Sequence, residues 1–307
     1  MLEIRNLVKR YGKVSALDNL SLAISKGEIF GFVGPNGAGK TTTMKIICGL
    51  LSADSGDVIV DGINAHKNIK MLKGKIGYMP DFFGVYDNLK AIEYMEFYAS
   101  IYGLSGMKAR RRCMDLLALV QLEDQANSYV DDMSRGMKQR LCLARSIVHD
   151  PELVILDELA SGLDPRARYE MKEILKELHK RGKTIVISSH ILPELAQVCT
   201  HIGIIEKGKM VVKGTVDEIL TMRGTSRPLV MKITDKQEYA IEILKQNKLV
   251  LNVTILDNSI SVYFSGNEKE EAALLAEMVQ NEVGVSSFAR EDSDLETLFL
   301  QITQKEE

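Results

Sequence analysis

The sequence predicts an α/β chain with a larger domain built on a buried parallel sheet and a small α+β domain of ferredoxin-like order. A glycine-rich turn at 34–39 lies between an apolar run and a helical pattern. Residues 153–156 are an uninterrupted apolar run, as expected of a parallel strand buried on both faces. Beyond about residue 223 the pattern changes to strand, helix, strand, strand, helix, strand.

The larger domain is expected to span 1–223. Apolar positions predict strands near 2–8, 17–24 and 28–33, and a helix from 39 to about 50. Helices over 89–102, 107–120 and 138–149 would form a helical insert of about 84–150. The strand pattern returns at 153–156 and 184–187. Asp164 before Pro165 predicts a helix start, because Asp caps a helix and Pro suits its first turn.

The C-terminal domain is expected to span 228–307, after a boundary segment that reads RGTSRP. We expect strands over 229–234, 249–256, 260–264 and 285–290. Helices are expected over 237–247 and 268–281, and a closing helix over 294–303. This order is typical of a ferredoxin-like module.

Composition excludes several classes of protein. The 39 basic and 42 acidic residues among 307 give a net charge of -3, so nucleic acid is not an expected partner. No apolar run approaches the ~20 residues that cross a bilayer, and the start lacks a signal peptide, so we expect a cytoplasmic chain. The cysteines contain no CxxC pair, so reduced and mostly buried thiols are expected at these positions: Cys48, Cys113, Cys142 and Cys199.

Residues 34–41 read GPNGAGKT and match the GxxxxGK[ST] pattern of a P-loop, between a predicted strand and a predicted helix. Glycines let backbone N–H groups converge on phosphate oxygens, and the helix N-terminus favours negative charge. Lys40 would reach the β- and γ-phosphates, and the Thr41 hydroxyl would bind Mg²⁺. The predicted nucleotide-binding residues of this loop are Gly34, Pro35, Asn36, Gly37, Ala38, Gly39, Lys40, Thr41 and Thr42.

Two carboxylates follow the apolar run at 153–156. Successive side chains of a strand point to opposite faces, so Asp157 and Glu158 can have different roles. Asp157 would hold Mg²⁺, directly or through water. Glu158 would orient and deprotonate an attacking water.

Three further segments complete a pattern. Residues 133–140 read MSRGMKQR, residues 161–164 read SGLD, and residues 188–190 read SSH at the end of a predicted strand. With the P-loop and the acidic pair, the chain resembles the ATP-binding cassette (ABC) ATPases over 1–223. These segments are similar to the LSGGQ signature, the D-loop and the H-loop of that family.

The resemblance implies a mechanism with ATP and Mg²⁺ as cofactors. Two such domains would pair head to tail and sandwich two ATP molecules. Ser134 and Gly136 would face the γ-phosphate held by the partner, with Asp164 in the D-loop. His190 would hold the γ-phosphate and the attacking water, and Tyr11 would lie against adenine.

The sequence departs from the family pattern at four positions. Asp81 stands where the family has Gln after a strand, so we hypothesise that it binds Mg²⁺ and sharpens the dependence on that ion. Arg135 and Met137 replace signature residues, and Leu159 replaces a proline. None of these changes removes a reacting group.

Residues 291–300, EDSDLETLFL, resemble the tails of bacterial antibiotic-resistance-type exporter ATPases. The predicted function is therefore the ATP-hydrolysing subunit of an exporter, peripheral on the cytoplasmic face of the membrane. It would dock on a separate integral-membrane permease near residues 82–88, and would dimerise with itself or a related ATPase chain. A soluble ABC machine, a slow ATP-binding switch and an importer subunit remain alternatives. The C-terminal domain would serve either dimerisation or regulation.

Overall fold

The computed structural model describes residues 1–81, 84, 88–159, 162–221, 228–256 and 259–290. Contacts divide the chain into two units, Met1–Val216 and Asp217–Glu307. The boundary thus lies a few residues before the segment 223–228 that the sequence indicated. The predicted helix at 294–303, Ser161 and most of the permease-docking segment 82–88 lie outside the described residues.

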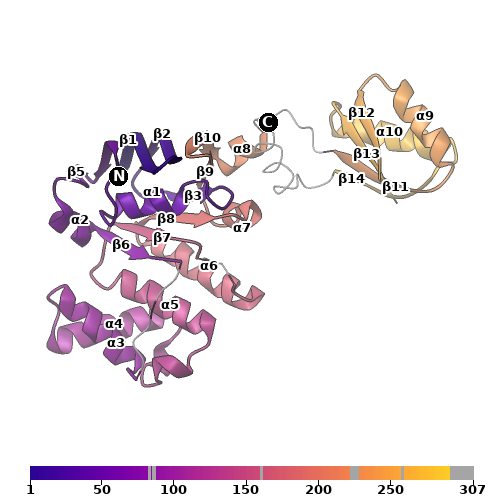
Figure 1. Ribbon diagram of the computed structural model, residues 1–307. Coiled ribbons are helices and arrows are strands. Elements are labelled where there is room, and N and C mark those ends of the chain that lie inside the picture. Colours follow the sequence, from indigo (N-terminus) through magenta and orange to yellow (C-terminus); the bar gives the residue numbers. More distant parts are fainter. Residues whose placement is uncertain (82–83, 85–87, 160–161, 222–227, 257–258, 291–307) are drawn as a thin grey trace. The chain divides into compact units, whose positions relative to one another are not determined.

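A six-stranded sheet of order β10-β9-β3-β8-β7-β6 is the centre of the first unit (Figure 1). Neighbouring strands from β6 to β9 pair in parallel, and only β10 is antiparallel to its neighbour. The carboxyl ends of the parallel strands therefore lie along one edge. The strands are β3 (Ile29–Val33), β6 (Ile76–Met79), β7 (Leu153–Leu156), β8 (Thr184–Ser189), β9 (His201–Glu206) and β10 (Lys209–Thr215).

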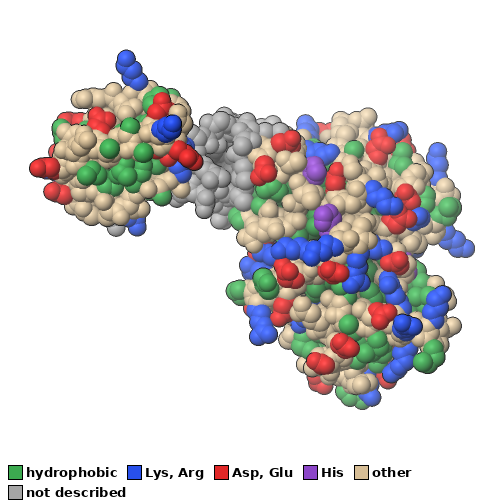
Figure 2. Space-filling model, turned by 180° about the vertical axis from the view of Figure 1, so that it is seen from behind, with side chains coloured by type: hydrophobic (Ala, Val, Ile, Leu, Met, Phe, Trp, Pro, Cys, Tyr) green, Lys and Arg blue, Asp and Glu red, His purple; other side chains and the backbone are tan. Residues whose placement is uncertain are grey.

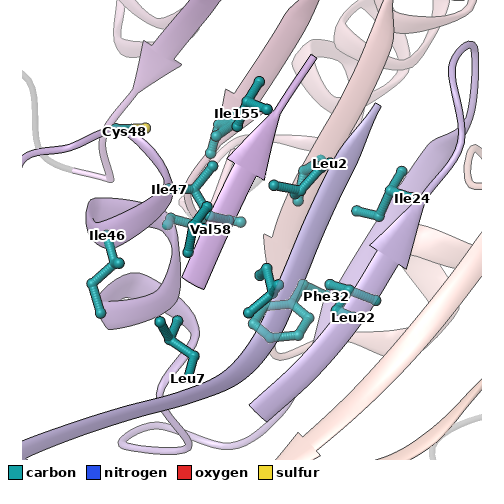
Figure 3. Close-up of a cluster of buried hydrophobic side chains, with 14 of the residues drawn as sticks. Leu2, Leu7, Leu22, Ile24, Phe32, Ile46, Ile47, Cys48, Val58 and Ile155 are labelled. Atoms are coloured by element: carbon teal, nitrogen blue, oxygen red, sulfur yellow. The ribbon is translucent and has the colours of Figure 1, made fainter. Parts of the chain in front are cut away.

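A second, antiparallel sheet has the order β2-β1-β4-β5. Helix α1 (Lys40–Ile47) packs between the two sheets, where Ile46 and Ile47 meet Val58 of β4 and Ile155 of β7 in one buried cluster (Figure 3). The sequence predicted a longer helix, but the chain leaves it at Cys48 and turns at Gly49, whose φ is +67°. The strands of this sheet are β1 (Leu2–Tyr11), β2 (Val14–Ile24), β4 (Ser55–Val60) and β5 (Ile63–Asn64).

Three helices lie between β6 and β7 along the chain and pack on one another: α3 (Ala91–Ile101), α4 (Gly106–Leu119) and α5 (Arg135–Ser146). Helix α5 begins three residues before the predicted start at 138, because the Ser134 side chain caps it. Helices α6 (Pro165–Lys180) and α7 (Leu192–Ala196) cover the face of the six-stranded sheet that is opposite to α1. The sequence reading missed α2 (Ile69–Lys75), α7 and α8 (Val216–Thr221).

The second unit has the predicted order of strands and helices over its described residues. Its sheet has the order β12-β13-β11-β14, and neighbouring strands are antiparallel. Each helix therefore connects two strands that have one other strand between them. Figure 2 shows apolar side chains gathered on the visible face of this unit. Its elements are β11 (Leu229–Asp235), α9 (Gln237–Gln246), β12 (Val250–Leu256), β13 (Ser259–Phe264), α10 (Glu268–Gln280) and β14 (Gly284–Arg290).

Two expectations from composition can be compared with this fold. All four cysteines are free and buried, as predicted. Among the described residues, no helix is both long enough and apolar enough to span a membrane.

Gly77 of β6 marks a place where the sheet and α5 touch through their backbones. A Cβ added there would lie 2.3 Å from the carbonyl oxygen of Ser146 and 3.0 Å from the Pro151 ring. We predict that Gly77→Ala lowers the free energy of unfolding by about 1–3 kcal/mol, because backbone cannot give way as a side chain does. Thermal unfolding followed by circular dichroism measures the loss.

Gly74→Ala is the matched control. Gly74 lies in α2, nothing stands within 4 Å of an added Cβ, and Ala is the better helix former there. Its unfolding midpoint should stay or rise. Equal midpoints for the two variants would contradict the close packing inferred at Gly77.

Candidate functional site

The glycine-rich loop joins β3 to α1 in a conformation that only glycines adopt easily. Gly37 and Gly39 have φ of +84° and +107°, and a Cβ on Gly39 would lie 2.5 Å from the Ala16 carbonyl oxygen. No acidic side chain lies in the first turn of α1. The N–H groups of that turn, which have no partner within a helix, therefore remain available for an anion.

Lys40 folds back over this loop and is nearly buried, with 5% of its surface exposed. Its ammonium donates to the carbonyl oxygens of Gly34 at 2.7 Å and Pro35 at 3.2 Å. It also lies 3.3 Å from Oε1 of Glu158. The structure thus brings the loop lysine and the second carboxylate of the acidic pair together.

Asp157 is the most deeply buried acid of the site, 1% exposed. Its Oδ1 accepts from the hydroxyls of Ser188 at 2.6 Å and Thr41 at 3.2 Å. Burial raises the pKa of Asp157, these two hydrogen bonds lower it, and the charges of Glu158 and Asp81 raise it further. The net direction is upward, so the ionised form is costly in the free protein.

The second oxygen of this carboxylate, Oδ2, is buried without a hydrogen-bond partner among the described residues. An unpartnered buried carboxylate oxygen beside a threonine hydroxyl is a donor set that suits a hard cation such as Mg²⁺. No group of three or more His, Cys, Asp or Glu side chains forms a closed metal cage in the described part of the chain. That also suits Mg²⁺, which is usually held by one or two carboxylates together with substrate phosphates.

Glu158 lies at the carboxyl end of β7 with a φ of +49°, which is uncommon for a residue other than glycine. Its N–H donates to the Ser188 hydroxyl at 2.9 Å, and its Oε2 lies 2.9 Å from Nδ1 of His190. The carboxylate is therefore positioned between the Lys40 ammonium and the exposed His190 ring.

Asp81 follows β6 and is exposed. Its charge is near enough to contribute to the raised pKa of Asp157. The structure therefore places Asp81 at the same edge of the sheet as the acidic pair.

A second group of predicted residues lies at the start of α5. Ser134 accepts a hydrogen bond from the Met137 N–H at 3.3 Å. A Cβ on Gly136 would lie 3.0 Å from Cβ of Ala167, so α5 and α6 touch here. Asp164 caps α6, as predicted, by accepting from the Ala167 N–H at 2.8 Å. Ser134 and Asp164 thus bond within the helices that they cap, and Gly136 lies against α6.

Arg135 belongs to this second group as well. Gly162 has a φ of +69°, and a Cβ added there would lie 2.5 Å from Cζ of the Arg135 guanidinium. The side chain that replaces a signature glycine therefore covers the described part of the D-loop turn.

Tyr11 lies at the end of β1, opposite Val14, and is half exposed. The Lys9 ammonium lies 5.7 Å from its ring centroid. Ala16, two residues beyond Val14, borders the P-loop at Gly39. The ring is therefore carried by a hairpin that borders the P-loop, with one face engaged by a cation.

Ser188 is the residue of this site that the sequence reading did not single out. It was noted only as part of the SSH segment, whereas its hydroxyl contacts both Asp157 and Glu158. A serine at the end of a buried strand carries no signal of its own. Only the pairing of β7 with β8 makes it a neighbour of the acidic pair.

A parallel sheet with a P-loop, an acidic pair and a histidine at one edge defines a nucleotide-binding protein of the ATP-binding cassette class. Residues 17–161 match the family model described as ABC transporter. With a relative that is 34% identical over 99% of this chain and 98% of its own length, the chain belongs to the family of ABC transporter ATP-binding proteins. That relative is the linearmycin resistance ATP-binding protein LnrL of Bacillus subtilis (strain 168).

Other relatives agree with this placement. The bacitracin transport ATP-binding protein BcrA of Bacillus licheniformis is 33% identical over 98% of this chain and 97% of its own. A solved ATP-binding subunit of an ABC transporter matches with a TM-score of 0.66 and 31% identity, covering 73% of this chain and 93% of that one. A dimeric ATP-binding cassette, solved with ADP and phosphate after hydrolysis, matches with a TM-score of 0.65 and 27% identity, covering 70% and 99%. The predicted family and the mixed α/β cassette fold are thereby confirmed.

The buried charge of Asp157 leads to a prediction about stability and pH. Because its pKa is raised above the ordinary 3.8, its favourable contribution is complete at low pH and is lost as pH rises through the raised value. Asp157→Asn should therefore raise the unfolding midpoint of the nucleotide-free protein at about pH 7.5, by roughly 2–4 °C. Differential scanning calorimetry across pH measures the gain.

The gain should shrink as pH falls through the raised pKa, where the aspartate of the parent becomes protonated. Asp124→Asn serves as the control, because Asp124 is exposed and its charge is not among those that raise the pKa of Asp157. A constant difference between Asp157→Asn and the parent at all pH values would contradict the raised pKa.

Proposed function

We propose that this chain is the ATP-hydrolysing subunit of an exporter and that it docks on a separate membrane permease. The observation that carries this proposal is the convergence of Lys40, Thr41, Asp157, Glu158 and His190 at one edge of the parallel sheet. A loop that suits phosphate, an oxygen pair that suits Mg²⁺ and a carboxylate beside a histidine are the groups that phosphoanhydride hydrolysis needs.

Each group has a separate task in this proposal. The N–H groups at the start of α1 and the Lys40 ammonium bind the β- and γ-phosphates. The Thr41 hydroxyl and the Asp157 carboxylate hold Mg²⁺, with Asp81 near enough to add a further oxygen. A bound Mg²⁺ supplies neutralisation of phosphate charge.

Glu158 is the proposed general base and His190 its companion at the γ-phosphate. When a phosphate takes the Lys40 ammonium, Glu158 loses that ion pair and keeps its contact with His190, so its Oε1 becomes free to accept a proton from water. His190 is exposed on the site edge, where it can contact both the γ-phosphate and that water. Tyr11 would stack on adenine after releasing its contact with Lys9.

The second group, Ser134 and Gly136, is proposed to act on a nucleotide held by another copy. They lie at the start of α5, where Gly136 contacts α6 and the Ser134 residue is exposed. A related cassette that was solved as a dimer with ADP and phosphate supports a nucleotide sandwich formed with itself or a related ATPase chain. Asp164 and Arg135 would lie at the same interface.

A pocket of about 370 Å³ between the six-stranded sheet and the α3–α5 group is the proposed contact with the permease. Apolar and aromatic side chains border it, and two of them, Leu50 and Tyr102, are exposed. Among the described residues that line it, Lys73 and Arg145 are basic and none is acidic, so it suits a short permease segment with an apolar side chain and a carboxylate. The pocket is lined by Cys48, Leu50, Lys73, Ile76, Tyr78, Pro80, Tyr98, Tyr102, Arg145 and Ser146.

The remaining parts of the proposal concern the direction of transport and the second unit. Relatives named for linearmycin resistance and for bacitracin transport support export, on the cytoplasmic face of the membrane. The strand order β12-β13-β11-β14 supports a ferredoxin-like C-terminal module over 228–307, accessory to the ABC domain over 1–223.

Glu158→Gln should lower steady-state ATP turnover by about 10²–10⁴-fold, because a general base is lost while the phosphate-binding groups remain. An ATP-bound dimer should accumulate, detected by size-exclusion chromatography with light scattering. Glu152→Gln, the same change at the other end of β7, removes only surface ion pairs with Lys26 and Lys75 and should keep parent turnover. Parent turnover in Glu158→Gln would refute the base assignment.

Leu50→Asp should reduce recovery of the permease about tenfold, because it removes an exposed apolar contact and repels the expected carboxylate. The measurement is co-purification from gently solubilised native membranes, followed by identification of the partners. Tyr169→Asp, an equally exposed position on α6 outside the pocket, should recover a stoichiometric multi-span protein as the parent does. Ribosomal or DNA-associated partners without a membrane protein would favour the soluble ABC machine instead.

A further inference from the structure

We propose that Ser188 is a positioning residue whose one hydroxyl fixes both the metal-binding carboxylate and the general base. The inference rests on the proposed ATP hydrolysis and names a residue that acts through Asp157 and Glu158. Ser188 lies at the end of β8 and is fully buried. Leu156 pairs with Ile187 in the parallel register, so Ser188 lies beside the first residue after β7.

The direction of the hydroxyl proton follows from its two partners. The Glu158 N–H can only donate, so the Ser188 oxygen accepts from it, at 2.9 Å. The proton of the hydroxyl is then directed to Oδ1 of Asp157, at 2.6 Å, which is a short bond as expected for a charged acceptor. A serine hydroxyl has the donor and the acceptor that this arrangement needs.

The bond to Oδ1 determines which oxygen of Asp157 remains for a cation. Oδ1 already accepts from Ser188 and Thr41, whereas Oδ2 is buried and has no partner in the described chain. Without the hydroxyl of residue 188 only the longer bond from Thr41, at 3.2 Å, would hold Oδ1, and the carboxylate could rotate about its last bond. The two oxygens would then exchange places and the open position would no longer be fixed.

The bond from the Glu158 N–H holds the backbone in its left-handed conformation, with φ at +49°. That conformation costs roughly 1–2 kcal/mol for a residue with a Cβ, so a hydrogen bond is needed to maintain it. It directs the carboxylate toward Lys40 and His190. The same hydroxyl thus sets the direction of the base.

A cavity of about 40 Å³ next to Ser188 makes a shape-matched test feasible. Ile187, Met171 and Leu175 line it together with Ser188. We expect this space to accept the methyl group that Thr or Val would add, and these two side chains differ chiefly in the hydroxyl. Comparison of Ser188→Thr with Ser188→Val therefore separates hydrogen bonding from packing.

The probe is ADP, titrated by calorimetry with and without Mg²⁺, alongside steady-state ATP turnover of the same full-length proteins. Ser188→Thr should keep the parent's enhancement of ADP affinity by Mg²⁺ and its turnover. Ser188→Val should lose about tenfold or more of each, the loss expected from a hydrogen bond to a charged group. Its Mg²⁺-free ADP affinity should remain within about twofold of the parent, because the P-loop is unchanged.

Equal Mg²⁺ enhancement in Ser188→Thr and Ser188→Val would overturn the inference, since packing alone would then explain the serine. If Ser188→Val does not fold, as judged by its thermal unfolding, Ser188→Ala replaces it and the same criterion applies. Failure of the proposed function has a different signature. A parent protein without Mg²⁺-dependent ADP binding or ATP turnover would overturn that function and this inference together.

Discussion

The parallel register of β6, β7, β8 and β3 is the constraint on which the site depends. Each strand contributes its carboxyl end to the same edge, and each end carries a different group: Asp81, the acidic pair, His190 and the P-loop. None of these groups is near another in the sequence. They lie close together because the strands that they follow are paired, so the site depends on the register of the buried sheet.

The buried carboxylate of Asp157 shows what such rigidity costs. In water its two oxygens would be fully solvated, whereas here one oxygen has two hydroxyl partners and the other has none among the described residues. The protein thus keeps a buried carboxylate oxygen without a hydrogen bond, at a cost in free energy that a bound cation would offset. The unpartnered Oδ2 of Asp157 lowers the stability of the nucleotide-free protein, and the same atom is the proposed ligand for the cation.

The sequence was sufficient to predict those features that depend on residues close together in the chain. A glycine pattern between a strand and a helix predicts the P-loop, and an apolar run predicts the buried strand before the acidic pair. It was insufficient where the meaning of a residue depends on pairing between distant segments. Ser188 looks like any strand residue until β8 is placed beside β7, and the early start of α5 depends on one capping hydroxyl at Ser134. Asp81 was identifiable only as a departure from a family pattern.

The close approach at Gly77 has a mechanical consequence. Most contacts between a sheet and its covering helices pass through side chains, which can change rotamer and absorb a displacement. At Gly77 the strand instead meets the Ser146 carbonyl directly, at the end of α5. Backbone atoms cannot change rotamer, so this contact cannot absorb a displacement as a side chain does. A displacement at the start of α5, where Ser134 lies, would therefore pass to β6 through backbone atoms rather than through side chains that can change rotamer.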